Sequence, residues 1–244
     1  MEAQSKRVAL VTGANKGLGL EIARQMGRTG ATVLVGARNR EAGEEAAAAL
    51  ASEGIDARFI ELDVAVYTSI DGAAGSITDG FGRLDILVNN AGINDPADGP
   101  VPTARLDAVE RVLRTNFLGA LAVTQAVLPL LRKSRAARIV NLSSGLGSLT
   151  QNGDLLYPYA AAKLIGYSAS KAALNMLTVQ LAYLLRDTAI KVNSADPGYT
   201  ATDLNGHRGT QTIPEGAAEA IRLALLPDDG PTGTYSDSKG IVPW

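Results

Sequence analysis

Two tyrosine–lysine pairs and one serine are the residues of this sequence whose types and spacing could do chemistry. Tyr159 is followed four positions later by Lys163, and Tyr167 is followed four positions later by Lys171. Residues four apart lie on one face of a helix, and a nearby ammonium favours tyrosinate and so lowers the pKa of the phenol. Such a tyrosine can donate a proton to a carbonyl oxygen while hydride adds to the carbon. Ser144 lies upstream of both pairs and could hold that oxygen by a hydrogen bond.

A glycine-rich turn could bind the phosphates of a dinucleotide. The segment TGANKGLG, residues 12–19, follows a strand-like apolar run and opens a helical pattern. Glycine allows positive φ and close approach of the backbone to a pyrophosphate, and a helix N-terminus presents free N–H groups to its charge. The spacing departs from Gly-x-Gly-x-x-Gly, so a tight turn without a ligand is the alternative. The candidate contacts are Gly13, Asn15, Lys16, Gly17, Leu18 and Gly19.

The end of the second expected strand bears on which cofactor would fit. An acidic residue there would bind an unphosphorylated ribose, whereas arginine can accept a 2′-phosphate. The sequence has Arg38 and Asn39 at this point and no acidic side chain. Lys16 could reach the same phosphate, and two cations would offer it charge-assisted hydrogen bonds. The sequence therefore predicts NADP(H), with ordinary solvated cations at Lys16 and Arg38 as the alternative.

Strands and helices alternate along the chain. Short apolar runs predict parallel strands buried on both faces, at residues 7–11, 32–36, 57–61, 86–89, 138–142, 190–194 and 233–236. Helical patterns lie between them, at residues 19–29, 40–53, 69–81, 106–131, 167–185 and 214–225. This order predicts an α/β fold over residues 1–244, a single doubly wound, Rossmann-type domain whose parallel sheet carries helices on both faces.

The composition excludes several classes of function. The 244 residues are 46% hydrophobic with a formal net charge of −2, which argues against nucleic acid or an anionic membrane as a partner. Without cysteine and with His207 as the only histidine, the chain can form no disulfide, thiolate site or multi-histidine metal site. It has no long apolar span, and its polar N-terminus leads into a strand pattern, not a signal peptide. We expect a cytoplasmic protein without a metal site.

Several motifs in one order resemble those of the short-chain dehydrogenase/reductase family over essentially the whole chain. After TGANKGLG come NNAG at residues 89–92, RTNFLGA around Asn116, SSG from residue 143, YSASK from residue 167 and DPG at residues 196–198. The closing segment, which contains GPTG at residues 230–233 and ends in Trp244, is similar to that of the monomeric NADPH-dependent carbonyl reductases. The resemblance implies a Rossmann-type oxidoreductase.

The resemblance also separates the two tyrosine–lysine pairs. On a continuous helix the tyrosines would lie about 80° apart and about 12 Å along the axis, so both cannot serve one site. Tyr167 precedes Pro197 by 30 residues, which matches the family's usual distance between this helix and the next strand. The distance from Ser144 to Tyr159 is closer to the family's usual one, but the carbonyl reductase branch has an insertion there. Tyr167 is therefore the predicted proton donor.

Other site residues follow from the same resemblance. The implied catalytic set is Asn116, Ser144, Tyr167 and Lys171. Asn116 would bend its helix and hold a water near Lys171, or alternatively be structural only. Asp63 would contact the adenine or, alternatively, be a helix N-cap. Further implied cofactor contacts are Val64, Asn90, Ala91, Gly92, Tyr167, Lys171, Pro197, Gly198, Thr200 and Thr202.

A mostly apolar set of residues is expected to line the substrate pocket. These residues are Ile93, Ser144, Leu146, Leu149, Leu155, Tyr199, Leu204 and Trp244. The polar segment 203–212 contains two glycines and is expected to form a short lid. His207 in this segment is interpreted as a solvated loop residue, with a substrate contact as the alternative.

The leading hypothesis is an NADPH-dependent reductase of small-molecule aldehydes or ketones, reversible as an alcohol dehydrogenase. The second is a ketoreductase for a dedicated or carrier-bound biosynthetic substrate. A non-enzymatic NADP(H)-binding sensor or scaffold also fits the fold, but it should lack at least one of Ser144, Tyr167 and Lys171. Residues 147–166 look longer than in the family's tetramers and could cover their pairing surface, so a monomer is expected.

Overall fold

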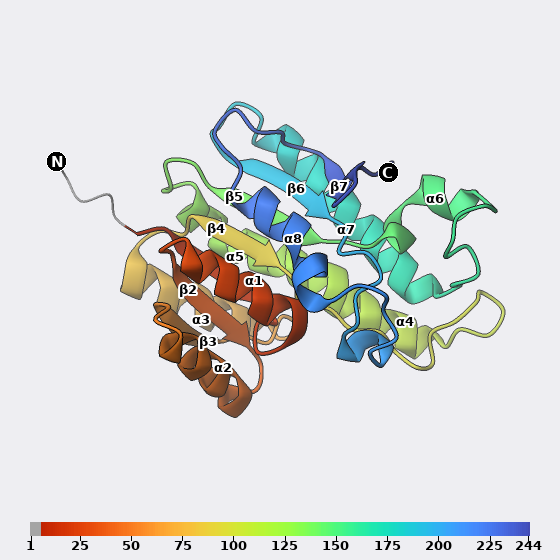
Figure 1. Ribbon diagram of the computed structural model, residues 1–244, viewed down its shortest axis with the longest axis horizontal. Coiled ribbons are helices and arrows are strands. Elements are labelled where there is room, and N and C mark those ends of the chain that lie inside the picture. The colour runs from red at the N-terminus through yellow and green to blue at the C-terminus, as the bar shows by residue number, and fades with distance from the viewer. Residues whose placement is uncertain (1–5) are drawn as a thin grey trace.

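A single eight-stranded sheet forms the centre of the computed structural model, which describes residues 6–244 (Figure 1). Its strand order is β3-β2-β1-β4-β5-β6-β7-β8. The strands are β1 (Val8–Thr12), β2 (Thr32–Ala37), β3 (Ala57–Glu61), β4 (Ile86–Asn89), β5 (Arg138–Leu142), β6 (Lys191–Ala195), β7 (Tyr235–Asp237) and β8 (Gly240–Ile241). All neighbours are parallel except β7 and β8. The predicted doubly wound α/β domain is confirmed. Residues 1–5 of the N-terminus that argued against a signal peptide lie outside the described residues.

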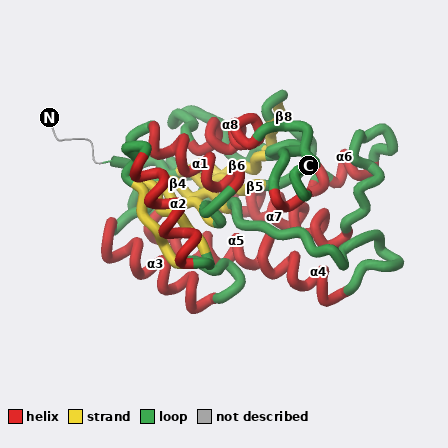
Figure 2. Tube along the Cα trace, turned by 60° about the horizontal axis from the view of Figure 1, so that its bottom comes forward, coloured by secondary structure: helices red, strands yellow, loops and turns green. Residues whose placement is uncertain are grey.

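Helices cover both faces of this sheet (Figure 2). They are α1 (Gly17–Arg28), α2 (Arg40–Ser52), α3 (Tyr67–Phe81), α4 (Leu106–Leu113), α5 (Ala120–Leu131), α6 (Leu149–Gly153), α7 (Ile165–Leu184) and α8 (Ile213–Ala224). Alternate residues of a strand point to opposite faces. Ala9 and Val11 therefore pack with α1, α2 and α8, whereas Val8 and Leu10 pack with α3, α5 and α7. The apolar run of β1 thus serves two cores.

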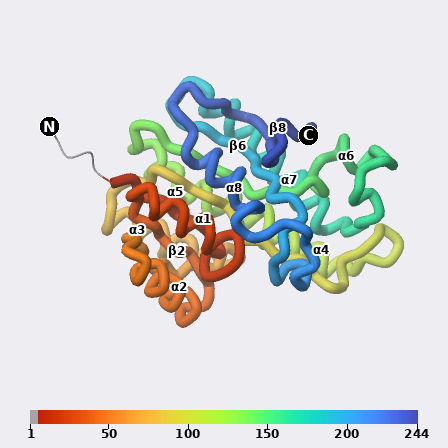
Figure 3. The backbone as a smooth tube through the Cα atoms, viewed as in Figure 1, coloured from red at the N-terminus to blue at the C-terminus, as the bar shows by residue number. Residues whose placement is uncertain are grey.

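Helix α8, late in the sequence, packs beside α1, which is the first helix. Ala217 and Leu223 of α8 belong to the same buried cluster as Ile22 and Met26 of α1. Figure 3 shows the two helices side by side although they lie far apart in the sequence. The loop that enters α8 is thereby held near the glycine-rich turn that enters α1.

Most predicted elements are present, with ends shifted by one or two residues, but one predicted helix is wrong. The helix expected over residues 106–131 is divided by a π-helical segment, Arg114–Gly119, between α4 and α5. Helix α6, strand β8 and two short 3-10 turns, Gly145–Gly147 and Asp203–Asn205, were not predicted. These elements are too short to show a periodic pattern.

A buried polar network joins the central strands beneath their carboxyl ends. The amide of Asn89 donates to Thr124 Oγ1 at 3.0 Å and to Asn141 Oδ1 at 2.8 Å. The amide of Asn141 donates to Thr178 Oγ1 at 2.8 Å, and Thr178 shares a hydrogen bond of 2.8 Å with Ser194. Buried polar groups that are paired in this way fix the relative positions of β4, β5, β6 and α7.

Within residues 6–244, no helix combines the length and the apolar character needed to cross a membrane. The same residues gather no three histidine, aspartate or glutamate side chains as metal ligands.

Candidate active site

A cleft of about 1340 Å³ opens at the carboxyl ends of the parallel strands. Ligands of open α/β sheets bind at this edge. The loops after β1, β2, β4, β5 and β6 contribute Gly13, Arg38, Asn90, Ser144 and Asp196 to its walls. Residues between Gly13 and Ile213, far apart in the sequence, therefore meet in one cleft.

Tyr167 and Lys171 lie on the first turns of α7 and face this cleft together with Ser144. The Ser144 side chain lies near the Tyr167 hydroxyl and acts to lower the pKa of Tyr167. Lys171 is buried; its Nζ lies 5.6 Å from the centre of the Tyr167 ring and donates to the Leu142 carbonyl oxygen at 2.7 Å. The structure thus brings the predicted serine, tyrosine and lysine together.

Burial dominates the electrostatics of this pair. It raises the pKa of Tyr167 to about 12, although the neighbouring Ser144 side chain acts in the opposite direction. It also lowers the pKa of Lys171 to about 8, opposed by the negative charge of Asp196. The prediction that Lys171 lowers the pKa of Tyr167 is therefore wrong for the structure described here. The reason is that burial disfavours both charged forms, and the ammonium is directed to the Leu142 carbonyl.

The alternative pair, Tyr159 and Lys163, does not lie on a helix. Both residues belong to the irregular segment between α6 and α7, and α7 begins only at Ile165. The assumption of one continuous helix through both tyrosines is therefore wrong. The Tyr159 ring lines the cleft and packs against Tyr157 and Tyr199, with ring centres 5.6 and 5.7 Å apart.

Asn116 lies in the π-helical segment, where its helix was predicted to bend. Its Oδ1 accepts from the Ile93 backbone N–H at 2.8 Å, and its Nδ2 donates to the Ile93 carbonyl and to Ser170 Oγ, both at 3.0 Å. A Cβ added to Gly92 would lie 3.4 Å from Asn116 Oδ1 and 3.6 Å from Lys171 Nζ, so both atoms face the Gly92 backbone. Asn116 thus ties the loop after β4 to α7.

The glycine-rich turn has the backbone conformation that a phosphate-binding loop requires. Gly13 and Gly17 have φ angles of +63° and +57°, which other residues rarely adopt. The helix α1 begins at Gly17, and within the described residues no side chain caps its first N–H groups. Those N–H groups face the cleft mouth, where the helix dipole favours an anion.

Asn90 holds the glycine-rich turn against the end of β4. Its side-chain amide donates to the carbonyl oxygens of Thr12 at 2.8 Å and Gly13 at 3.1 Å. In return, Thr12 Oγ1 accepts from the backbone N–H groups of Asn90 at 3.0 Å and Ala91 at 2.9 Å. Thr12 was missed in the sequence because a threonine at the end of a strand gives no signal of such a contact.

The two predicted phosphate-binding cations have different surroundings. Arg38 is exposed at the cleft and forms no ion pair with another described residue. Lys16 instead forms an ion pair with Asp203, and the other oxygen of Asp203 lies 2.7 Å from His207 Nε2. The neighbouring Asn39 accepts from the Ala42 N–H at 2.8 Å and caps α2. Of these two cations, only Arg38 has no ion pair with another residue that the structure describes.

Asp63 and Val64 lie in the cleft wall after β3. Asp63 Oδ1 accepts from the Ala65 N–H at 2.9 Å, and the helix α3 begins later, at Tyr67, with Val66 at the N-cap. The alternative interpretation of Asp63 as a helix N-cap is therefore wrong. Its carboxylate closes a turn beside the cleft.

The segment after β6 forms another wall of the cleft. Gly198 has a φ of +64°, and Thr200 is buried and donates to the Pro197 carbonyl at 2.8 Å. Thr202 lies at the cleft and precedes the short turn Asp203–Asn205. The exposed His207 also lines the cleft and has a positive φ of 59°.

The predicted substrate-pocket residues divide into two groups. Four apolar or aromatic residues and the serine do line the cleft, namely Ile93, Ser144, Leu146, Tyr199 and Leu204. Leu149, Leu155 and Trp244 are not among the lining residues, so their placement was wrong. Leu149 and Leu155 are largely exposed, and the Trp244 ring stacks on Tyr235 with centres 5.5 Å apart.

Three further residues of the site were missed in the sequence. Asp196 and Tyr157 line the cleft, and the buried Asp98 lies behind it. The position of Asp196 directly after a strand was a usable signal, because that is where cleft residues of such sheets lie. Tyr157 and Asp98 lie in irregular segments and gave no such signal.

Asp98 caps the helix that carries the catalytic candidates. Its Oδ1 accepts from the Gly166 N–H at 2.9 Å, and its Oδ2 accepts from the Tyr167 N–H at 2.8 Å. A carboxylate in this position satisfies free N–H groups and interacts favourably with the helix dipole. Asp98 thus helps to hold the backbone of Tyr167 in place.

We expect Asp98→Ala to lower the free energy of unfolding by about 1–2 kcal/mol, because it leaves these buried N–H groups without a partner. Urea unfolding followed by circular dichroism measures the change. Asp154→Ala is the matched control, since Asp154 is exposed and its side chain accepts, among the described residues, only from the nearby Leu156 N–H. Equal changes in the two variants would contradict the capping role.

Comparison with known proteins agrees with this geometry. The description of the matching family is "short chain dehydrogenase", and the match covers residues 7–212. A relative from Saponaria officinalis, short-chain dehydrogenase/reductase 1, is 36% identical and covers 98% of this chain and 96% of its own. The structure of NADPH-bound carbonyl reductase from chicken fatty liver superposes with a TM-score of 0.85 at 29% identity, covering 98% of this chain and 99% of that one.

Salutaridine reductase from Papaver somniferum superposes with a TM-score of 0.82 at 30% identity, covering 94% of this chain and 99% of that one. The family match extends from β1 to the entry of α8 and so includes every residue of the cleft wall except Ile213. The chain therefore belongs to the short-chain dehydrogenase family of oxidoreductases.

Proposed function

We propose that the protein reduces the carbonyl group of small-molecule aldehydes or ketones with NADPH, and that it can catalyse the reverse reaction. The observation that carries this proposal is the meeting of Ser144, Tyr167 and Lys171 in one cleft. The relatives support it, since two similar structures are named carbonyl reductase and salutaridine reductase.

The residues of the cleft fit a phosphorylated dinucleotide. The open N-terminus of α1 and the positive φ angles of Gly13 and Gly17 suit a pyrophosphate, and Arg38 suits a 2′-phosphate. The similar carbonyl reductase from chicken fatty liver has NADPH bound in its crystal structure. When bound, NADPH supplies the hydride. The proposed contacts are Gly13, Asn15, Lys16, Gly17, Leu18, Gly19, Arg38, Asn39, Asp63, Val64, Asn90, Ala91, Gly92, Tyr167, Lys171, Pro197, Gly198, Thr200 and Thr202, all in the cleft wall.

Each catalytic candidate has a role that its position allows. Ser144 holds the carbonyl oxygen by a hydrogen bond, and the Tyr167 hydroxyl donates its proton to that oxygen. With a pKa raised to about 12, Tyr167 is protonated and ready to donate at neutral pH. Lys171, which lies beside the Tyr167 ring in the cleft wall, would hold the nicotinamide ribose. Asn116 positions Lys171 and Ile93 through its hydrogen bonds to the loop after β4 and to α7.

This assignment divides the single domain into two functional halves. The N-terminal half, up to β4, holds most of the dinucleotide contacts, whereas the C-terminal half supplies Ser144, Tyr167 and Lys171. The substrate would lie between them, against Ser144 and the residues Ile93, Leu146, Tyr199 and Leu204.

A screen for NADPH consumption tests the proposal. The purified protein is offered aldehydes, cyclic ketones, quinones and keto esters, and the loss of NADPH absorbance is followed. We expect consumption with at least one class and little with a Ser144→Ala variant. If NADPH binds but no class of carbonyl compound is reduced, the result contradicts the proposal and favours a non-enzymatic NADP(H)-binding protein.

We also expect the protein to be monomeric. The segment between Gly147 and Gly166 contains α6 and a long irregular stretch that leads directly into α7. As in the monomeric carbonyl reductases that the sequence resembles, this segment would cover part of the surface through which family tetramers pair. Light scattering at micromolar concentration should give a mass near 25.3 kDa. A mass about four times larger would contradict this expectation.

A further inference from the structure

A carboxylate without a basic partner lies in the cleft wall beside the proposed catalytic residues. Asp196 follows β6 directly, and one of its oxygens accepts from the Gly198 N–H at 2.9 Å. Within residues 6–244 no lysine or arginine forms a salt bridge with it. The chemistry proposed above does not use this side chain.

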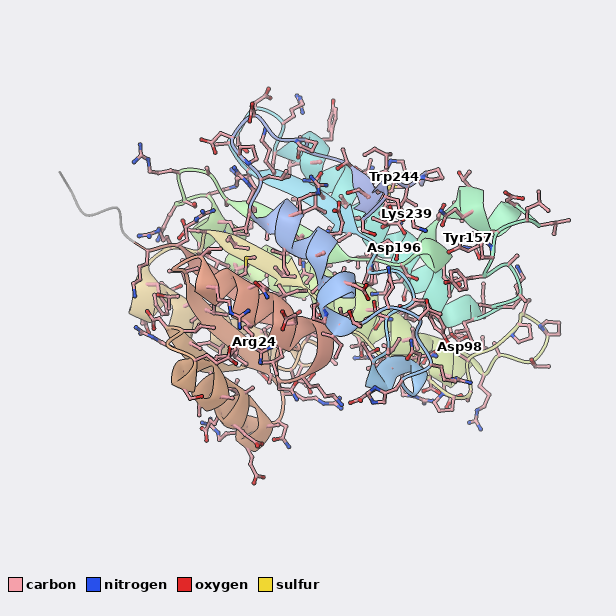
Figure 4. All side chains as sticks on the ribbon, viewed as in Figure 1. Arg24, Asp98, Tyr157, Asp196, Lys239 and Trp244 are labelled. Atoms are coloured by element: carbon pink, nitrogen blue, oxygen red, sulfur yellow. The ribbon has the colours of Figure 1, made fainter. Side chains whose placement is uncertain are left out.

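Three oxygen atoms are gathered around the Gly145 backbone next to Asp196. A Cβ added to Gly145 would overlap the Tyr157 hydroxyl oxygen, and it would lie 2.9 Å from Gln151 Oε1 and 3.2 Å from Asp196 Oδ2. Gln151 Oε1 is buried, and no described residue donates a hydrogen bond to it. In Figure 4, Asp196 and Tyr157 come from the end of β6 and from the segment after α6. Oxygen acceptors from three segments thus converge where only a glycine fits.

Three tyrosine rings line the cleft next to the oxygen atoms around Gly145. The rings of Tyr157 and Tyr159 are 5.6 Å apart, those of Tyr159 and Tyr199 are 5.7 Å apart, and all three residues line the cleft. The face of an aromatic ring attracts a cation through its quadrupole. A carboxylate beside several ring faces is a combination that suits a positively charged group.

The pKa shifts of Asp196 and Tyr157 also favour a cation at this place. Burial raises the pKa of Asp196, and the nearby Asp237 adds to this effect, whereas Lys171 and the backbone N–H groups of Gly198 and Gly145 oppose it. Burial and the charge of Asp196 also raise the pKa of Tyr157, to about 12. A bound cation would stabilise the charged form of Asp196 and so be favoured at this place.

We propose that Asp196, Tyr157 and the neighbouring tyrosine rings form a subsite that binds a protonated amine carried by the carbonyl substrate. The substrate class is thus an amino ketone or amino aldehyde, whose ammonium donates to Asp196 while its carbonyl group lies at Ser144 and Tyr167. This inference rests on the proposed function, because it concerns the substrate of the same cleft.

Three matched ketones test the subsite. They are aryl methyl ketones that differ only at the end of a two-carbon side arm, which carries an ammonium, a hydroxyl or a methyl group. We expect kcat/KM for the ammonium ketone to exceed that for the methyl ketone by roughly 10- to 100-fold, the effect of hydrogen bonds to charged groups. A hydroxyl ketone used as well as the ammonium ketone would overturn the proposal in favour of a neutral donor.

Two matched variants test whether Asp196 causes the preference for the ammonium ketone over the methyl ketone. Asp196→Asn keeps the size of the side chain and removes its charge, and it should lower the ammonium-to-methyl ratio by about tenfold or more. Asp237→Asn removes a nearby charge outside the cleft wall, where Asp237 Oδ1 accepts from the Lys239 and Gly240 N–H groups. That variant should keep most of the ratio. If Asp196→Asn slows all three ketones equally, Asp196 acts through Lys171 and the subsite is refuted.

A binding measurement separates this inference from the proposed reaction. Phenethylammonium has no carbonyl group, so its calorimetric titration does not depend on turnover. Binding to the parent protein that is lost in Asp196→Asn supports the subsite even if no ketone is reduced. Equal binding to both proteins overturns the subsite even if simple ketones are reduced.

Discussion

Replacement of Tyr167 by phenylalanine should lower kcat by about 100-fold or more while NADPH still binds, because general acid–base catalysis contributes on this scale. The substitution removes only the hydroxyl, which in the structure lies near Ser144, and keeps the ring beside Lys171. The steady-state kcat with a ketone from the screen measures the loss. A fluorescence titration with NADPH shows whether the cofactor site is intact.

Tyr159→Phe is the matched control for this prediction. Tyr159 lines the same cleft but precedes α7, and its ring packs between those of Tyr157 and Tyr199. The kcat of Tyr159→Phe should stay within a few-fold of that of the parent protein. The reason is that Tyr159 does not lie on α7, the helix that carries Lys171. The reverse pattern would move the proton donor to Tyr159. A comparable loss in both variants would assign Tyr159 to shaping the pocket, and the kinetics of cofactor binding would then separate the two effects.

The strands of the sheet were predictable because their pattern is local. A strand such as β1 is buried on both faces and so reads as an unbroken apolar run. The order of strands and helices then limits the possible folds to very few. The cleft residues after β1, β4, β5 and β6 were predictable for a related reason, since parallel strands end at the same edge.

Features that depend on distant contacts could not be predicted. The residues 106–131 read as one helix, but Asn116 bonds to Ile93 and to Ser170, which lies 54 positions away, and this region is π-helical. Asp98 caps α7 from a loop 68 positions earlier. No window of sequence contains both partners of such contacts.

The pKa shifts and ion pairs of the site could not be predicted from the sequence for the same reason. The spacing of Tyr167 and Lys171 indicated their common helix face but not their burial, which decides the direction of both pKa shifts. Lys16 was expected to be free for a phosphate, yet it pairs with Asp203, 187 positions away. Local spacing shows which side chains are neighbours on one element, whereas solvation and ion pairs depend on the whole fold.

Because Lys16 is paired with Asp203, a substitution of Arg38 tests the preference for NADPH over NADH more directly than a substitution of Lys16. Lys16 would have to share its charge between Asp203 and a phosphate, whereas Arg38 has no ion pair within the described residues. Arg38→Asp should lower kcat/KM with NADPH by roughly 100-fold. The variant loses charge-assisted hydrogen bonds worth about 1.5–3 kcal/mol and adds a repulsive charge. The kcat/KM with NADH, which has no 2′-phosphate, should change far less.

Arg40→Asp is the control for the Arg38 variant. It makes the same change of charge two positions away, but Arg40 lies outside the cleft wall and pairs with Glu44 and Glu61. An acidic residue in the first turn of α2 is also compatible with the helix dipole. The ratio of kcat/KM for NADPH over NADH should therefore stay close to that of the parent. Equal losses with NADPH and NADH in Arg38→Asp, or the same change of ratio in both variants, would show that Arg38 does not bind the 2′-phosphate.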